Sequence, residues 1–448
     1  MKILQVIHGF DSMAPGGTEV YTKMISRKLS DKHQVCVFHR ICRPELKEYS
    51  VTKSRQGNIE IASINMTFRK HGSFVNTYSD PCVDAAFGRL LDDVRPDIVH
   101  IQHLMHTSTG IAEQTKQRNI PIVLTLHDYW LLCPQGQRFK NNKELCGNAC
   151  VGDCIHCVGY QLNVSSYVLR LFQKNFPSPL IDAGRRFYQA LAQSNPRKSK
   201  RLLEDRRERM LATCGLIDLF LAPSQFIRHQ FIEAGVPKEK IIHLPHGIPE
   251  AQSKAKSKSE SLRFAFIGNL LPAKGAHVLI KSFNQLHNSS ATLKIFGQEG
   301  SYKGRVLNYP RHLRRSARNK NISFQPPFEH NQWQEVFRDI DVLIVPSLWH
   351  ENAPLVILEA LATNTPVLAT NTGGIPELLC DLPAFPLVRP DDAEDLLHHI
   401  RRLIDHPKTL GARRAASSSV FSMESHVLEL EKIFSLTISS FKDKNRTT

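Results

Sequence analysis

The sequence has no long apolar segment. None of its apolar runs approaches the roughly 18 residues that a helix needs to cross a bilayer, so we do not expect a membrane-spanning protein. Met1–His8 carries one lysine and a short apolar run, Ile3–Ile7, which is too short for the core of a secretory signal. This run is typical of a buried first strand. The sequence therefore predicts a cytoplasmic protein.

Acidic side chains are too few to balance the basic ones. The chain has 58 Lys and Arg against 42 Asp and Glu, a formal charge of +16 at pH 7, and the excess is concentrated in Arg185–Arg209 and Lys303–Lys320. Such an excess indicates nucleic acid, an anionic membrane surface or phosphorylated substrates as partners, or simply solvated helix faces. The basic stretches lack the interleaved aromatic residues of nucleic-acid-binding modules, which makes nucleic acid the least favoured partner.

The order of apolar segments predicts two α/β domains in the 448 residues. Short apolar runs alternate with amphipathic stretches in both halves, which is typical of doubly wound parallel sheets that bind ligands at the carboxyl ends of their strands. The strands expected in the first half are Ile3–Ile7, Val35–Arg40, Ile59–Ile64, Asp97–Gln102, Ile120–His127 and Leu216–Ala222. Those expected in the second are Phe264–Ile267, Thr292–Phe296, Ile322–Gln325, Val342–Val345, Pro366–Ala369 and Phe385–Val388.

The domain limits follow from changes in composition. Ser and Lys alternate over 250–262 without apolar periodicity, which predicts a linker between a first domain, 1–249, and a second, 263–410. A last helix, Ser425–Phe441, lies in the C-terminal segment 411–448 and is expected to pack back across the first domain. Residues 129–215 fit neither pattern, and an insertion of this size at a strand end is usually functional.

Two glutamates flank the start of a helix in the second half. A buried strand, Asp341–Ser347, leads through a loop to a helix beginning near Pro354. The free amides of its first turn, those of Leu355 and Val356, favour an anion such as a diphosphate. Glu351 in the loop and Glu359 in the helix can each accept hydrogen bonds from hydroxyl groups. The pattern suits a ligand with a sugar, a diphosphate and a ribose in that order.

This segment resembles the Glu-x7-Glu motif of the family 4 retaining glycosyltransferases. Thr370–Glu377 is similar to that family's Gly-Gly-x-x-Glu element, Pro15–Glu19 to its glycine loop, and Gly268–Gly275 to the segment whose lysine meets the donor diphosphate. The resemblance implies the GT-B fold, two Rossmann-like domains facing across a cleft. It also implies transfer of a sugar from a nucleotide sugar, UDP- or GDP-linked, to a cell-surface polysaccharide or lipid-linked glycan, on the inner face of the plasma membrane.

The resemblance also assigns roles to residues. Glu359 would hold the ribose and Glu351 the transferred sugar, while Lys274 would neutralise the diphosphate. Asn269 is also assigned to the donor site, although many relatives have an arginine at this position, so that one cation for the diphosphate is missing here. His127, at a strand end, would lie near the sugar and the acceptor; His103 is assigned to the acceptor side, although His100 and His106 compete with it. The remaining implied contacts are Gly16, Gly17, Gly373 and Gly374 on the donor and Glu19 on the acceptor side. Catalysis in the family requires no metal; the leaving phosphate is proposed to take the acceptor proton.

Two other enzyme classes share this fold. A nucleotide-sugar 2-epimerase or an α-glucan phosphorylase also places paired acids or a phosphate site between two domains. The order of the motifs does not favour the epimerase. An assay of sugar transfer against epimerisation of the donor separates these activities.

Half of the ten cysteines fall within one short segment. Cytosolic proteins rarely keep disulfides, so neighbouring cysteines indicate a metal site or free thiols. Cys154-x2-Cys157 has the spacing of a zinc half-site. We predict one structural metal, zinc before iron–sulfur, held by four of Cys133, Cys146, Cys150, Cys154 and Cys157.

Overall fold

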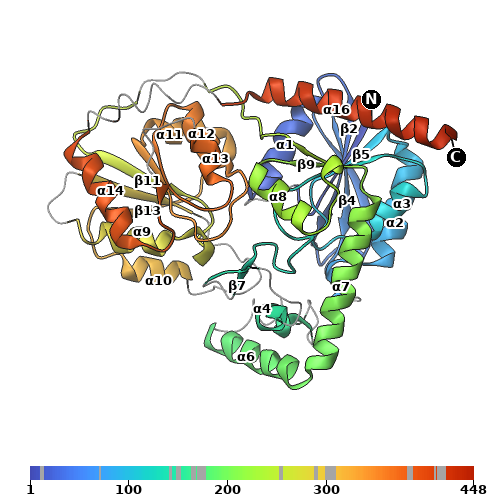
Figure 1. Ribbon diagram of the computed structural model, residues 1–448, viewed down its shortest axis with the longest axis horizontal. Coiled ribbons are helices and arrows are strands. Elements are labelled where there is room, and N and C mark those ends of the chain that lie inside the picture. Colours follow the sequence, from blue (N-terminus) through green and yellow to red (C-terminus); the bar gives the residue numbers. More distant parts are fainter. Residues whose placement is uncertain are drawn as a thin grey trace.

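The computed structural model consists of two α/β domains, and a helical arm extends from the first (Figure 1). It describes residues 1–448 except 11–14, 70–71, 141–143, 148–152, 163–167, 169–177, 252–255, 287–290, 298–308, 381–386, 408–409, 411–419 and 448. Part of the basic stretch Lys303–Lys320 therefore lies outside the described residues, as do residues 252–255 of the linker. Among the described residues, no helix is both long and apolar enough to cross a membrane.

The first domain is built on an eight-stranded sheet. Its strands are β1 (Lys2–Ile7), β2 (Gln34–Ile41), β3 (Val51–Gln56), β4 (Ile59–Asn65), β5 (Ile98–Ile101), β6 (Ile122–Thr125), β9 (Leu219–Ala222) and β10 (Ile241–His243). They lie in the order β10-β9-β6-β5-β1-β2-β4-β3. The strands after β1 are first added on one side of it (β2, β4, β3) and then on the other (β5, β6, β9, β10). All pairs are parallel except β3–β4. The predicted doubly wound sheet is confirmed.

Helices cover both faces of this sheet because alternate strand residues point in opposite directions. Leu4 and Val6 of β1 pack in the cluster that includes α2 (Pro81–Val94) and α3 (Gly110–Lys116). Ile3 and Ile7 pack in the cluster that includes α1 (Gly17–Leu29) and the final helix, α16 (Met423–Thr447). The sheet is therefore buried on both sides, as expected for parallel strands.

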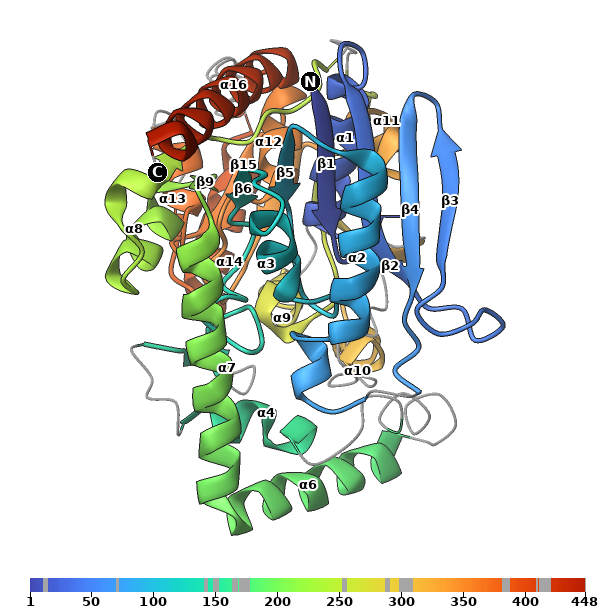
Figure 2. The same cartoon turned by 90° about the vertical axis from the view of Figure 1, so that its right-hand side faces the viewer.

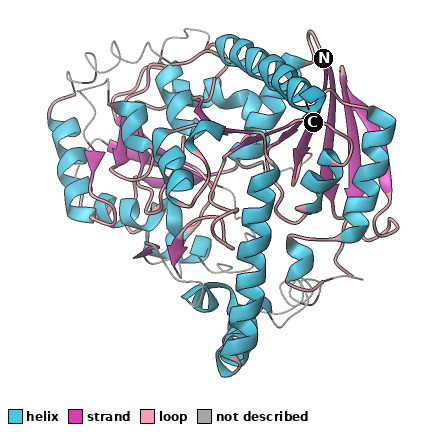
Figure 3. Cartoon of the chain, turned by 45° about the vertical axis from the view of Figure 1, so that its right-hand side comes forward, coloured by secondary structure: helices cyan, strands magenta, loops and turns pink. Residues whose placement is uncertain are grey.

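The second domain contains a six-stranded parallel sheet. Its order is β13-β12-β11-β14-β15-β16, formed by β11 (Leu262–Ile267), β12 (Ala291–Phe296), β13 (Ile322–Gln325), β14 (Val342–Val345), β15 (Val367–Thr370) and β16 (Leu387–Val388). Its helices are α9 (Ala276–Phe283), α10 (Tyr309–Ser316), α11 (Trp333–Arg338), α12 (Leu355–Ala362), α13 (Ile375–Leu379) and α14 (Ala393–Asp405). Figure 3 shows helices flanking the sheets of both domains.

The sheet of the first domain contains two strands that the sequence analysis does not predict. β3 lies at the sheet edge, and most of its residues are exposed, so it lacks the apolar run of a buried strand. β10 has only three residues, and Ile242 on it is 39% exposed. Both are edge strands, whose side chains need not be apolar.

The insertion is largely helical, although its sequence lacks a regular apolar pattern. It contains the short hairpin β7 (Phe139–Lys140) and β8 (Glu144–Leu145), followed by α4 (Cys154–Leu162), α6 (Ser178–Ser194) and α7 (Pro196–Leu216). The buried residues of α7 recur at helical spacing, but they include the polar Ser199 and Arg206 as well as Leu203 and Met210. The apolar periodicity of a buried helix face is therefore not visible in the sequence. The α6–α7 arm extends away from the body of the molecule (Figure 2).

The chain passes between the domains twice, and the two passages are hydrogen-bonded to each other. Ile248 forms an isolated parallel bridge with Ser422. Its amide donates to the carbonyl of Phe421 at 3.1 Å, and its carbonyl accepts from the amide of Met423 at 2.9 Å. α16 then lies across the first domain, where Glu431 accepts from His33 at 3.0 Å.

Candidate functional site

Glu351 lies in the loop between β14 and α12 and forms a buried ion pair. Its Oε1 accepts from Nζ of Lys274 at 2.6 Å and from the Ser347 hydroxyl at 2.7 Å, while its side chain is 5% exposed. Lys274 also lies over the ring of Trp349, 5.2 Å from its centroid. The structure thus brings together two residues that the sequence assigns to the sugar and the diphosphate.

Glu359 lies further along α12 and has a partner that the sequence analysis missed. Its Oε1 accepts from Nε2 of His330 at 2.7 Å, and the Glu359 side chain is 7% exposed. His330 begins a short 3₁₀ turn, His330–Gln332, before α11. No motif marks His330, because its position depends on the packing of α11 beside α12. One carboxylate oxygen is thereby fixed.

Two glycines allow the backbone of this loop to approach its neighbours closely. Gly373 has a φ of +60°, and a Cβ there would lie 2.1 Å from the carbonyl oxygen of Glu351. Gly275, which follows Lys274, has a φ of +72°, and its Cβ would lie 1.8 Å from the carbonyl oxygen of Pro346. Both positions require glycine. Gly374 donates its amide to the Glu351 carbonyl at 2.7 Å, so Gly373 and Gly374 hold the loop that carries Glu351.

The predicted glycine loop of the first domain faces the start of α12. Gly16 is the N-cap residue of α1, and a Cβ on Gly17 would lie 3.9 Å from Cδ1 of Leu355. The first amides of α1 and of α12, including those of Leu355 and Val356, have no acceptor within their own helices. They therefore favour the binding of an anion between the domains. Asn269 is exposed, and its carbonyl accepts from the amide of Leu271 at 2.8 Å.

His127 follows β6 and is held in one orientation. Its Nε2 lies 2.7 Å from Oε1 of Gln102, whose amide nitrogen donates to Oε1 of Gln5 at 2.9 Å. Oε1 of Gln102 is therefore the acceptor, so Nε2 of His127 carries the proton and Nδ1 is left as an acceptor. Across the domain boundary, Asn352 donates to the carbonyl of His127 at 2.6 Å. Burial and neighbouring histidines hold the pKa of His127 well below its usual value, which keeps the ring neutral.

His103 lies with Asp128 and His8 at the same edge of the sheet. Its Nδ1 accepts from the amide of Met105 at 2.9 Å, so Nε2 donates to Asp128 at 3.1 Å. The ring of His8 is 4.7 Å from that of His103, and Nε2 of His8 lies 2.9 Å from Glu19. Burial raises the pKa of Glu19, but the hydrogen bond and charge of His8 outweigh it, so the pKa lies below the usual value.

The two competing histidines lie elsewhere. His100 is buried within the sheet, with Nε2 2.8 Å from the Thr125 hydroxyl and its ring against Phe434 of α16. His106 packs its ring against Phe68. Of His100, His103 and His106, His103 is therefore the one that lies at the strand ends with His127 and Glu19.

A group of aromatic side chains behind His127 escaped the sequence analysis. The Tyr21 ring lies 5.1 Å from that of His127, and the Tyr21 hydroxyl is 2.7 Å from Nε2 of His426 on α16. His246 stacks on His127 at 5.4 Å. Burial lowers the pKa of His246 to about 3 and that of His426 to about 4. These residues come from distant segments, and only the fold brings them together.

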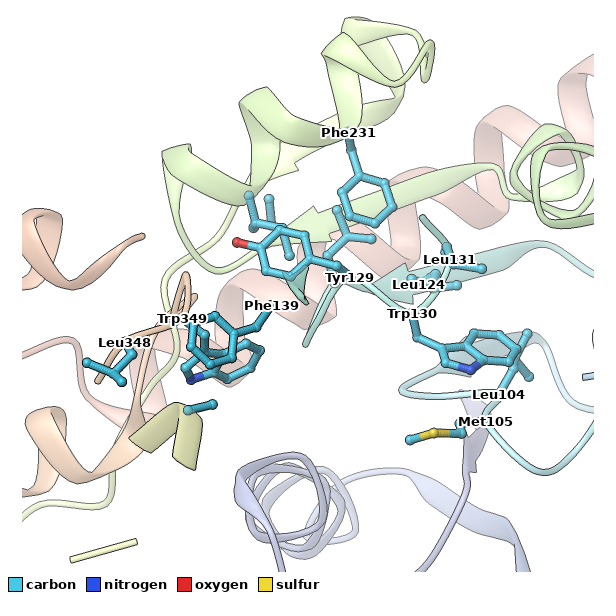
Figure 4. Packing of buried hydrophobic residues seen from close by; sticks show 14 of the residues in the cluster. Leu104, Met105, Leu124, Tyr129, Trp130, Leu131, Phe139, Phe231, Leu348 and Trp349 are labelled. Atoms are coloured by element: carbon cyan, nitrogen blue, oxygen red, sulfur yellow. The ribbon is translucent and has the colours of Figure 1, made fainter. Parts of the chain in front are cut away.

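The domains also meet through a carboxylate and an apolar contact. Glu377 of α13, in the predicted Gly-Gly-x-x-Glu element, accepts from the amides of Gln225 and Phe226, each at 2.6 Å, at the start of α8 (Gln225–Glu233) in the first domain. Tyr129 and Phe139 of the first domain gather with Leu348 and Trp349 of the second in one buried cluster (Figure 4). The side chains assigned to donor and acceptor thus belong to one continuous interface.

The predicted metal site is only partly within the described residues. Cys133, Cys146, Cys154 and Cys157 are partly buried, and Cys150 is not described. Burial, reinforced by Cys133, Cys157 and Cys146, raises the pKa of Cys154 to about 12. Within the described residues, no group of three possible ligands is placed to hold a metal. The metal stays a prediction.

Two Rossmann-like domains, each with a parallel sheet flanked by helices, define the GT-B class of fold. The chain belongs to glycosyltransferase family 4. The family described as Glycosyltransferase Family 4 matches residues 15–252, and that described as Glycosyl transferases group 1 matches residues 248–418. The predicted family and fold are both confirmed.

Curated relatives align with part of the chain. A D-inositol 3-phosphate glycosyltransferase of Streptomyces griseus is 26% identical over 212 residues, 45% of each chain. A lipopolysaccharide 1,2-N-acetylglucosaminetransferase of Salmonella typhimurium is 25% identical over 224 residues, 45% of this chain and 57% of the relative. The chain thus spans about half the length of the curated relatives it matches.

Solved structures resemble the whole chain. A sucrose-phosphate synthase from Thermosynechococcus elongatus matches with a TM-score of 0.66 and 16% identity, over 98% of this chain and 99% of that one. HepE of Anabaena, in complex with UDP and glucose, matches with a TM-score of 0.63 and 16% identity, over 97% and 99%. At this identity the likeness establishes the fold alone.

Proposed function

We propose that this protein is a retaining glycosyltransferase that moves a sugar from a UDP- or GDP-linked donor to a glycan or lipid-linked acceptor. The observation that carries the proposal is the pair of buried glutamates on either side of the start of α12. Glu351 is paired with Lys274 at 2.6 Å, and Glu359 with His330 at 2.7 Å. Each acid already has a cationic or polar partner and keeps oxygens for hydroxyl groups.

In this proposal the protein acts by positioning and by charge stabilisation. Lys274 and the first amides of α12 bind the diphosphate and stabilise the negative charge that grows on it as the sugar departs. Glu359 orients the ribose and Glu351 the sugar. The departing phosphate oxygen takes the acceptor proton. His127, neutral and with Nδ1 free to accept, receives a hydrogen bond from a sugar or acceptor hydroxyl and holds that group in place.

The acceptor is proposed to bind on the first domain, beside His103 and Glu19. His103 is fixed by Asp128, and Glu19 by His8, so each presents a defined polar surface at the strand ends. The relatives include a transferase named for lipopolysaccharide, and the net charge of +16 suits an anionic membrane surface. We therefore propose a cell-envelope glycan as acceptor and peripheral action on the cytoplasmic face of the membrane.

A two-stage experiment tests this function. Thermal unfolding is first measured with UDP-, GDP- and other nucleotide sugars, because a ligand that binds only the folded chain must raise the melting temperature. The stabilising donor is then incubated with glycan acceptors, and the anomeric configuration of the product is determined by NMR. A product with retained configuration supports the proposal. Absence of stabilisation by every nucleotide sugar, or epimerised donor without transfer, refutes it.

A further inference from the structure

The outer face of α6 is an exposed apolar stripe. Leu180 is 54% exposed, Phe187 59% and Leu191 40%, and they recur at seven- and four-residue spacing on one side of the helix. Ala183 and Ala190, at intermediate positions on that side, are also exposed. Scattered apolar residues at a surface are ordinary, but a continuous stripe along a helix marks a surface made for contact.

The opposite face of α6 is already occupied, which fixes the orientation of the stripe. Gln189 donates to the carbonyl of Ile155 at 2.6 Å and accepts from the amide of Tyr160 at 3.1 Å, both on α4. Ala192 is fully buried beside Gly159. Since α4 holds this inner face, the stripe faces outward, at the end of the molecule opposite α16 (Figures 1 and 2).

Basic residues lie on α6 and at the start of α7, next to the stripe. No acidic residue occurs from Ala183 to Leu203, a segment with six Lys and Arg. Five of these six are exposed: Arg186, Arg197, Lys198, Lys200 and Arg201. An apolar helix face bordered by cations suits the boundary between headgroups and acyl chains of an anionic bilayer. Asp182 precedes this segment and Glu204, Asp205 and Glu208 follow it, but basic residues outnumber acidic ones on both helices of the arm. An anionic bilayer attracts such a surface, whereas a second copy of this chain, with its net charge of +16, repels it.

We propose that α6 is the membrane-docking element of this protein, with its stripe inserted into the interface of an anionic bilayer. The inference rests on the proposed function for its purpose, but its test does not depend on activity. The sequence predicts such contact through Arg185–Arg209 and Tyr167–Phe172. All but Val168 of the second stretch lies outside the described residues, and the apolar contribution comes instead from the stripe of α6.

The arm connects the bilayer to the acceptor side of the site. Arg206 of α7 is buried; it donates to the carbonyl of Trp130 at 2.6 Å and lies over that ring at 5.1 Å. The Trp130 ring is 5.6 Å from that of His103. A membrane bound at α6 would therefore be held in a fixed relation to the residues proposed to bind the acceptor.

The test compares three forms of the full chain. The stripe variant replaces Leu180, Phe187 and Leu191 with serine. The control variant replaces Leu428 and Leu436 of α16, which are 48% and 68% exposed on the opposite side of the molecule, with serine. Co-sedimentation is measured with phosphatidylethanolamine vesicles containing or lacking phosphatidylglycerol, at low and high salt. Melting temperature and nucleotide binding confirm that each variant is folded.

We expect wild type and control to bind anionic vesicles, with weaker binding at high salt, and the stripe variant to bind about tenfold less or worse. A Phe187→Trp variant should shift its emission to shorter wavelength on anionic vesicles. Equal binding of stripe variant and wild type, or no binding of wild type, overturns the inference. The inference is also overturned if light scattering shows that wild type is a dimer and the stripe variant a monomer. If wild type binds no nucleotide, the proposed function is refuted, but the vesicle measurement still tests the docking of α6.

Discussion

Replacing Glu359 with alanine removes the carboxylate proposed to hold the donor ribose. The side chain is 7% exposed, so its hydrogen bonds form with little competition from water. One charge-assisted hydrogen bond is worth about 1.5 to 3 kcal/mol, which corresponds to a dissociation constant roughly 10- to 140-fold higher. The free nucleotide and the nucleotide sugar should weaken alike, because both contain the ribose.

The assay is isothermal titration calorimetry with the stabilising nucleotide and its sugar. Glu359→Gln keeps the volume beside His330 and should fall between wild type and alanine. Glu351→Ala should reduce turnover more than nucleotide affinity, since Glu351 is assigned to the sugar. Glu335→Ala, at an exposed position on α11, is the control and should change neither. If Glu359→Ala binds nucleotide as tightly as wild type, the ribose assignment is wrong.

Three further predictions follow from the buried and interdomain groups. Burial depresses the pKa of His100 and of His246 to about 3, so the unfolded chain binds protons that the folded chain does not. The free energy of unfolding should fall as pH drops from about 6.5, by about 1.4 kcal/mol per pH unit for each histidine. In His100→Gln, urea titrations at several pH values should show that this free energy changes less steeply with pH, by the contribution of one proton. An unchanged pH dependence counts against the prediction. Glu377→Gln should weaken the contact with α8 and increase the radius of gyration in small-angle scattering; an unchanged radius would show that this contact does not hold the domains together. Protein purified without chelators should contain about one equivalent of zinc or iron, lost in Cys154→Ser, whereas less than about 0.2 equivalents excludes the four-cysteine site.

The sequence predicts the parts of the site that lie close together along the chain. Glu351 and Glu359 are recognisable because one strand, one loop and one helix carry both. The ends of β5 and β6 likewise indicate His103 and His127. His330, Tyr21 and His426 could not be predicted, since each reaches the site through packing between distant segments. The stripe of α6 was also missed because an exposed apolar face has no signature that distinguishes it from a buried one.

The double passage of the chain at Ile248 and Ser422 has a mechanical consequence. A single connecting strand would let the domains swivel in any direction, but two strands hydrogen-bonded side by side resist twisting and permit bending about one axis. In the proposed function, opening of the domains for donor entry and product release would therefore bend about that one axis. Gly247 lies against His426, where a Cβ would approach that side chain to 2.5 Å, so the pivot is packed directly against the histidine group behind His127. Bending at this pivot would therefore move the histidines behind His127.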